Sequence, residues 1–319
     1  MSDRISLLRL TDGRMMEFAE YGDPEGDPLF FFHGFIGSHH QAMLADKAAR
    51  TQGIRIIAAN RPGIGRSSPS KFRTMTEYAA DILELADALH IDTFGVIGAS
   101  GGGCFALATA YVAPDRVRIV GVFGAIGPMN ILYNVQQLRW FRRLFLQGCH
   151  GYPVTAQFLL SGFIAYCRNY PQTFYRMLLR SSDLGEHLLW RSDIQRILWS
   201  DYQSVFLQPG GSRGLLLEAC LYFHWGFNLH DFPGDIRVLF WHGRDDSVVP
   251  LSCLRRIVRP IPRSQAILCP GGHLSFLMSD PSMVLKTIKQ EWHAASEWSE
   301  SEEFTHEPVF DAVRYPAIS

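Results

Sequence analysis

Hydrophobic and polar positions alternate along the chain in blocks that predict a layered α/β architecture. Short apolar runs, typical of buried strands, occupy residues 29–32, 54–59, 94–97 and 117–123. Segments with helical character lie between and after these runs, at about 41–52, 75–90 and 101–111. Strands that alternate with helices indicate a mostly parallel sheet with helices on its faces.

Local signals support two of the N-terminal elements. Residues 5–21 hold two β-like runs around an Asp12-Gly13 pair, which favours an antiparallel hairpin with a tight turn. The helix predicted at 75–90 is preceded by Thr74 with Glu77 three residues later, the spacing of a capping box. Apolar residues at helical spacing then predict a face that covers the sheet: Tyr78, Ile82, Leu85 and Leu89.

The alternation disappears between residues 129 and 232, and this segment contains 20 of the 40 aromatic residues within 104 of 319 positions. We expect an inserted helical cap. The aromatic side chains build a core from little sequence, or they line a wall for a substrate, and both can hold. Strand and helix patterns then resume at 237–241, 251–258, 265–268 and 274–293.

These boundaries predict three parts. Residues 1–128 and 233–295 form an α/β core, residues 129–232 the cap, and residues 296–319 an acidic C-terminal tail to which we assign no function.

Composition limits the class of protein. Hydrophobic residues make up 47% and charged residues 19% of the chain, which is ordinary for a globular fold, and the net charge of -1 disfavours nucleic acid as a partner. The sequence lacks the apolar core of a signal peptide and an apolar run of roughly 20 residues, which favours a cytoplasmic protein without a spanning segment. Peripheral contact with lipid stays open. The six scattered cysteines favour buried thiols over disulfides.

A candidate nucleophile occurs at residues 98–102, where Gly-Ala-Ser-Gly-Gly fits the G-x-S-x-G pattern of a strand-to-helix turn that exposes a serine. Residues 210–214 fit the same pattern around Ser212. Ser100 directly follows an apolar strand, whereas Ser212 follows Pro209, which removes a backbone donor. The strand context therefore favours Ser100.

Acyl transfer by a serine also requires hydrogen-bond donors for the oxyanion, a general base and an acid that orients the base. Phe32-His33-Gly34-Phe35 ends a predicted strand, so the backbone N–H groups of Phe35 and Gly101 are the candidate oxyanion donors. We interpret His33 as structural, because such a turn can use its hydrogen bonds without needing a base.

Five segments together resemble the α/β-hydrolase superfamily: FFFHGF, NRPGIGRS, GASGGG, WHGRDDSVVP and PGGHLSF, in this order along the chain. The resemblance implies the order nucleophile, acid, histidine. It places the acid at Asp246, through Gly243, Val249 and Pro250, and makes Asp245 one position too early. It places the base at His273, in a loop after the last strand of the core. His242 is then interpreted as a packed residue.

The resemblance implies a serine esterase, of the carboxylesterase or lysophospholipase type, that acts on a small or acyl-chain ester and needs no cofactor. A serine nucleophile argues against haloalkane dehalogenases and epoxide hydrolases, and HGFIG in place of HGGPG weakens a proline iminopeptidase. A peptidase, a thioesterase and a non-catalytic ligand receptor with this fold remain alternatives. No motif for a metal site or for nucleotide phosphates is present. The oligomeric state is left open.

Overall fold

The fold is described by a computed structural model, in which residues 5–181, 191–297 and 309–311 are described. Nine strands in this part of the chain form one sheet in the order β1-β2-β4-β3-β5-β6-β7-β8-β9. The strands are β1 (Ile5–Arg9), β2 (Met15–Gly22), β3 (Asp27–Phe32), β4 (Ile54–Ala59), β5 (Phe94–Ala99), β6 (Val117–Phe123), β7 (Arg237–Gly243), β8 (Ser264–Cys269) and β9 (Val309–Asp311). Only the pairs β1–β2 and β2–β4 are antiparallel, so the predicted mostly parallel sheet is confirmed.

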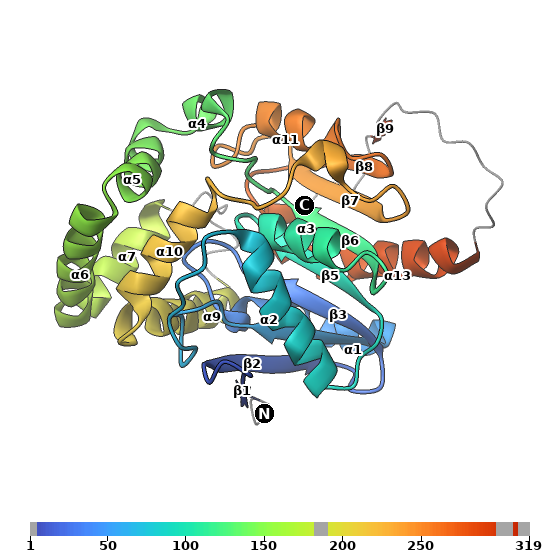
Figure 1. Cartoon of the computed structure of the whole chain (residues 1–319), viewed down its shortest axis with the longest axis horizontal. Coiled ribbons are helices and arrows are strands. Elements are labelled where there is room, and N and C mark those ends of the chain that lie inside the picture. Colours follow the sequence, from blue (N-terminus) through green and yellow to red (C-terminus); the bar gives the residue numbers. More distant parts are fainter. Residues whose placement is uncertain (1–4, 182–190, 298–308, 312–319) are drawn as a thin grey trace.

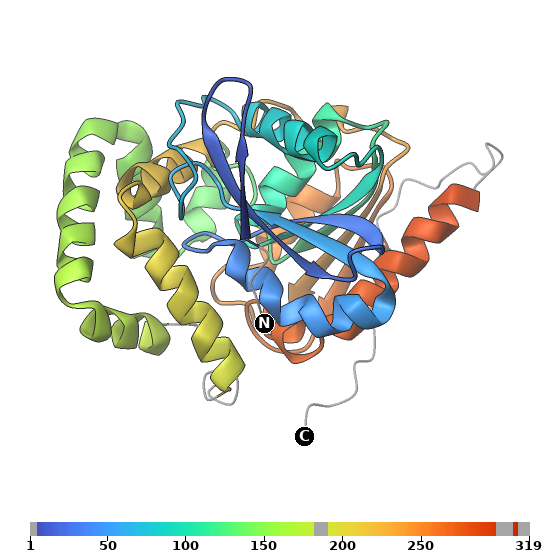
Figure 2. The same cartoon turned by 90° about the horizontal axis from the view of Figure 1, so that it is seen from below.

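Helices cover both faces of the sheet (Figures 1 and 2). They include α1 (Asp46–Gln52), α2 (Met75–Ala88), α3 (Gly102–Val112), α11 (Leu251–Val258) and α13 (Pro281–Glu297). Side chains alternate along a strand, so Phe30 and Phe32 of β3 pack with α2 and α3 in one buried cluster. Leu29 and Phe31 belong to a second cluster, with α1 and α13. A strand buried on both faces explains the continuous apolar run of β3.

The segment between β6 and β7 is helical in its described part and lies at one end of the sheet (Figure 1). It contains α4 (Leu132–Gln137), α5 (Trp140–Gly151), α6 (Pro153–Asn169), α7 (Pro171–Ser181), α9 (Ser192–Tyr202) and α10 (Gly211–Leu221). We call residues 132–221 the helical segment. Phe174, Tyr202 and Phe206 form much of its small aromatic core, with Ile64 of the loop after β4 packed against them.

Three local details differ from the sequence predictions. The helix expected at 41–52 is a 3-10 helix, η1 (His39–Ala45), followed by α1. The helix expected at 274–293 is split into α12 (Ser275–Ser279) and α13, because Pro281 has no N–H to continue the first helix. The capping box at Thr74 is not formed: Glu77 accepts from the backbone N–H of Arg73 and from the Thr74 hydroxyl.

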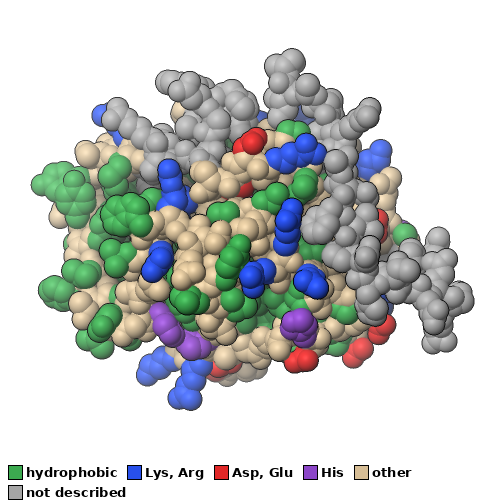
Figure 3. Space-filling model, turned by 90° about the horizontal axis from the view of Figure 1, so that it is seen from above, with side chains coloured by type: hydrophobic (Ala, Val, Ile, Leu, Met, Phe, Trp, Pro, Cys, Tyr) green, Lys and Arg blue, Asp and Glu red, His purple; other side chains and the backbone are tan. Residues whose placement is uncertain are grey.

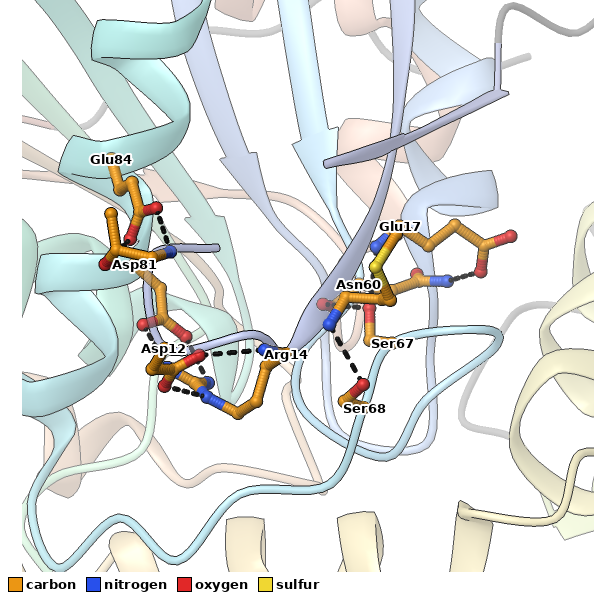
Figure 4. A network of polar contacts seen from close by, with 10 residues as sticks. Asp12, Arg14, Glu17, Asn60, Ser67, Ser68, Asp81 and Glu84 are labelled. Carbon is orange, nitrogen blue, oxygen red and sulfur yellow. Dashed lines mark hydrogen bonds and ion pairs between the residues drawn. The ribbon is translucent and has the colours of Figure 1, made fainter. Parts of the chain in front are cut away.

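Polar side chains fasten the N-terminal hairpin to the core (Figure 4). Arg14, after the predicted Asp12-Gly13 turn, donates two hydrogen bonds of 2.6 and 2.7 Å to Asp81 on α2. Glu17 on β2 accepts from the amide of Asn60, which follows β4, at 2.7 Å. A bidentate arginine–carboxylate pair fixes the relative orientation of its partners and also adds charge attraction. These contacts connect the antiparallel edge of the sheet to α2 and to the residue that follows β4.

Within the predicted tail, β9 pairs in parallel with β8, and the other residues from 298 onward lie outside the described part. All six cysteines are free thiols, and five are buried. Among the described helices, none has the length and apolar character needed to cross a bilayer.

The Arg61-Pro62-Gly63 turn packs closely against α10, and we expect this contact to require glycine at residue 63. Gly63 has φ +82°, and a Cβ placed there would lie 2.8 Å from the Cα of Gly214. We expect Gly63→Ala to lower the free energy of unfolding by about 1–3 kcal/mol, because it adds strain and separates two backbones. Urea denaturation measures this. Gly148→Ala on α5 is the control, since a Cβ there meets nothing within 4 Å; an equal loss in both variants would contradict the prediction.

Candidate functional site

Ser100 lies in a strained turn between β5 and α3. Its φ is +52°, in the left-handed region that few residues other than glycine adopt. The turn is held by its N–H, which donates to Phe123 O at 2.6 Å, and by its carbonyl, which accepts from Gly103 N–H. A Cβ at Gly102 would overlap the carbonyl oxygen of Phe32, so only glycine permits α3 to start this close to β3. This is the strand-to-helix geometry that the G-x-S-x-G pattern predicts.

Asp246 and His273 are joined directly. Asp246 follows β7 and is buried, and its Oδ2 lies 2.7 Å from Nδ1 of His273, which follows β8. The backbone N–H groups of Val248 and Val249 each donate to Oδ1 at 2.8 Å. Burial alone would raise the pKa of Asp246, but the hydrogen bond and charge of His273 and the Val249 N–H outweigh it, so that this pKa lies below its ordinary value. A carboxylate held in this way fixes the imidazole ring and leaves Nε2 for proton transfer.

The structure brings His273 to the same end of the sheet as Ser100. A Cβ at Gly124 would lie 3.0 Å from Cε1 of His273, and Gly124 follows Phe123, whose carbonyl accepts from Ser100. Within the described part of the chain, no hydrogen bond joins the Ser100 hydroxyl to His273. In enzymes without substrate, such contacts are often longer than in the reacting complex.

The two candidate oxyanion donors lie next to Ser100. A Cβ at Gly34 would be 3.6 Å from Cβ of Ser100, which places the 33–35 loop beside the serine. Gly101 is the N-cap residue of α3, where N–H groups lack helical partners. Among the described residues, neither Phe35 N–H nor Gly101 N–H donates a hydrogen bond to the protein. Both donors are therefore unused by the fold.

Arg61 holds the 33–35 loop from behind. Its guanidinium donates to the carbonyls of His33 at 2.6 Å and Gly34 at 2.9 Å, and to the carboxylate of Glu218 on α10 at 2.7 Å. His33 is fully buried and contacts this network; burial, with the charge of Arg61, holds its pKa well below the ordinary value. A neutral, buried His33 agrees with its structural interpretation.

Glu218 also accepts a hydrogen bond that holds Tyr222 against Gly101. Its Oε1 accepts from the hydroxyl of Tyr222 at 2.5 Å. A side chain at Gly101 would collide with that hydroxyl. Burial raises the pKa of Glu218, while Arg61 and Tyr222 act in the opposite direction. Glu218 and Tyr222 were not predicted from the sequence, because a single Glu in a helix and a Tyr at its C-cap form no pattern that points to a site.

A second contact from the helical segment reaches the same loop. Gly34 N–H donates to the amide oxygen of Gln41 at 2.8 Å, and the Gln41 amide nitrogen donates to Asp201 on α9 at 2.8 Å. Asp201 also accepts from the backbone and hydroxyl of Ser38, at 2.9 and 2.6 Å. Burial raises the pKa of Asp201 from its ordinary 3.8 to about 7, against these hydrogen bonds.

The residues that the sequence analysis ranked lower occupy different positions. Ser212 lies in the first turn of α10, where its hydroxyl accepts from the amide of Gln157 at 3.0 Å. Asp245 is exposed. His242 is buried as expected, but its Nε2 also lies 3.5 Å from Asp246 Oδ2 and 2.8 Å from Val249 O. Burial lowers the pKa of His242, so it faces Asp246 as a neutral ring.

No group of three or more potential metal ligands occurs among the described residues.

Residues 27–280 match the family described as alpha/beta hydrolase fold. The chain belongs to this family. The match extends from β3 to Asp280 and includes all three residues predicted for the reaction, Ser100, Asp246 and His273. The superfamily resemblance found in the sequence is therefore confirmed, and the chain is a member of a family of hydrolases.

The chain is also similar to individual proteins. The chain is 32% identical over 136 residues to the dihydrolipoyllysine-residue acetyltransferase component of an acetoin cleaving system from Pseudomonas putida, covering 40% of this chain and 35% of that protein. It thus spans about a third of that relative's length. It is 23% identical over 280 residues to a poly(3-hydroxyalkanoate) depolymerase from Ectopseudomonas oleovorans, covering 85% and 87%. A hydrolase structure from Pseudomonas aeruginosa PA01 aligns with a TM-score of 0.64 at 18% identity, covering 92% and 99%, and so shares the fold.

The raised pKa of the buried Asp201 makes the stability of the protein depend on pH. Because its pKa is raised in the folded state, the folded chain binds a proton that the unfolded chain releases between pH of about 4 and about 7. We expect the stability of the wild type relative to Asp201→Asn to fall as the pH rises through this window, by up to about 1.4 kcal/mol per pH unit. Chemical denaturation at a series of pH values measures the difference.

Asp193, on the same helix, provides the control. It is exposed, and the hydrogen bond from Arg191 lowers its pKa. The stability of the wild type relative to Asp193→Asn should therefore not fall as the pH rises. Parallel curves for the two variants would show that Asp201 does not titrate as described.

Proposed function

We propose that the chain is a serine hydrolase that cleaves a carboxylic ester through an acyl-enzyme. The observation that carries this proposal is the strained turn of Ser100, next to two unused backbone N–H groups and at the same end of the sheet as the Asp246–His273 pair. A hydroxyl without a base is a weak nucleophile, so strain that exposes it has a use only where a base is near. These are the parts that acyl transfer needs.

In the proposed reaction, Ser100 Oγ attacks the ester carbonyl while His273 Nε2 accepts the hydroxyl proton. The N–H groups of Phe35 and Gly101 bind the oxyanion of the tetrahedral intermediate. His273 then donates the proton to the leaving alcohol, and the acyl group stays on Ser100. Water then attacks the acyl-enzyme while His273 accepts a proton from it. The bond to Ser100 Oγ breaks, Ser100 regains its proton from His273, and the carboxylic acid is released. Asp246 stays ionised and stabilises the imidazolium.

We further propose that residues 129–232 act as a cap on a core formed by residues 1–128 and 233–295. Support comes from contacts between residues 129–232 and the loop that contains one proposed oxyanion donor. The ring of Phe145 on α5 lies 5.9 Å from that of Phe35, and the ring of Tyr222 lies 5.8 Å from it. Aromatic walls of this kind favour an acyl chain or another apolar ester group over a charged one.

Labelling with a fluorophosphonate probe tests the nucleophile. We expect wild-type protein to be labelled and Ser100→Ala to lose both labelling and ester turnover, by about 10⁴-fold or more in kcat. Ser212→Ala is the matched control, because it removes the serine of the second G-x-S-x-G sequence and should leave both readouts unchanged. A folded wild type that is not labelled would favour a ligand receptor instead.

A substrate panel tests the leaving group. We expect p-nitrophenyl esters to be hydrolysed with a dependence on acyl-chain length, and aminoacyl amides and acyl thioesters to be poorer substrates. The kcat/KM values compare the three classes directly. Faster turnover of amides would establish a peptidase, and faster turnover of thioesters a thioesterase, in place of the ester hydrolase.

A further inference from the structure

Helix α6 is apolar on both of its faces. Leu160, Ile164 and Cys167 point into the protein and are buried. On the opposite side, Val154 and Phe158 are 85% and 79% exposed. No charged residue occurs from Pro153 to Cys167. A helix that is hydrophobic all round is normally buried on all sides, so the outer side of α6 lacks the cover that its composition calls for.

The apolar outer side of α6 continues onto its neighbours. We call the whole area the outer helical surface, and define it by the exposed side chains Trp140, Phe141, Leu144, Tyr152, Val154, Phe158, Leu159, Tyr166, Tyr170 and Met177. Trp140, at the start of α5, is 76% exposed. Figure 3 shows hydrophobic side chains gathered on the side of the molecule where α5 and α6 lie, with Lys and Arg side chains between them.

Charge in this region has one sign. No Asp or Glu occurs between Asp115 and Asp183, a stretch that contains eight arginines, although the chain as a whole carries a net charge of -1. Arg139, Arg143 and Arg176 are exposed beside the apolar residues of α5 and α7. In the described part of the chain, α5, α6 and α7 therefore combine exposed aromatic and aliphatic side chains with arginines and contain no Asp or Glu.

We propose that the outer helical surface binds an anionic lipid bilayer and lies in its interface. Trp and Tyr have an apolar ring and a polar end, and such residues with arginine and leucine favour the boundary between headgroups and acyl chains. Positive charge is attracted to anionic headgroups. A second copy of this chain fits less well, because two such surfaces would bring arginines together.

This inference rests on the proposed function for its consequence, although not for its test. The inner side of α5 contacts Phe35 through Phe145, next to a proposed oxyanion donor. A protein seated on lipid by the outer sides of α5 and α6 would have its proposed cap between the bilayer and Ser100. The substrate class is then an ester drawn from a lipid surface.

The experiment measures sedimentation of the protein with vesicles of phosphatidylcholine, with and without phosphatidylglycerol. Ser100→Ala protein is used, so that binding does not depend on turnover. We expect binding to be stronger with phosphatidylglycerol and weaker at high salt. The pair Arg139→Gln and Arg143→Gln should weaken binding about fivefold for each arginine.

Leucine variants test whether vesicle binding depends on the outer helical surface or on any exposed leucine. Leu144→Ser with Leu159→Ser, on α5 and α6, should reduce binding by about tenfold or more. Leu7→Ser makes the same change at an exposed leucine of β1, outside the surface, and should bind as the parent does. Equal binding by all variants, or no preference for anionic vesicles, would overturn the proposal.

Two further readouts distinguish the remaining explanations. A dimer in gel filtration that the Leu144→Ser and Leu159→Ser changes convert to a monomer, without vesicle binding, would assign the surface to a second copy and overturn the lipid proposal. Turnover of a soluble p-nitrophenyl ester by otherwise wild-type protein is followed separately. If vesicles bind and the soluble ester is not hydrolysed, the proposed function fails while the lipid surface stands.

Discussion

The left-handed backbone of Ser100 is the constraint on which the rest of the site depends. It lets β5 end and α3 begin within two residues, and it can persist only where neighbouring elements over-determine the turn. Three elements do so: β6 accepts the Ser100 N–H, α3 donates back to the serine carbonyl, and β3 packs against Gly102 without room for a side chain. The same packing brings the 33–35 loop beside the serine. The strained backbone of Ser100 and the position of the 33–35 loop therefore depend on the same contacts.

Asp246 is held in place by hydrogen bonds to both of its carboxylate oxygens. Burying a carboxylate is unfavourable unless its oxygens are hydrogen-bonded. Here both oxygens are used, one by two backbone N–H groups and one by His273. The neutral His242 stands close to the second oxygen. The orientation of His273 is therefore set by the folding of the loop after β7, before any substrate is present.

Local patterns in the sequence predicted the strands from β1 to β8 and the helices of the core, but not β9, which lies in the predicted tail. The same patterns favoured Ser100 over Ser212. Apolar runs mark buried strands directly, and Ser100 follows such a run whereas Ser212 follows Pro209. Helix boundaries were harder to predict. The 3-10 helix η1 starts at His39, where the side chains of Ser38 and Asn60 accept from the backbone N–H groups of His40 and His39. The family resemblance predicted that Asp246 and His273 act together, and they are in contact. The contacts between the helical segment and the core were not predicted. Arg61 meets Glu218 across 157 positions, and Gln41 meets Asp201 across 160.

Those two long-range contacts have a consequence for how such a protein changes over time. Both end on the loop beside Ser100, and both begin on helices that lie outside the strand framework. The helical segment is therefore not an independent module. A replacement without carboxylates at the positions of Glu218 and Asp201 would leave Arg61 as a buried cation without its partner and the Gln41 amide without its acceptor. A new segment could replace it only with compensating changes around His33 and Ser38. Diversification of the helices and of the loop is thereby coupled.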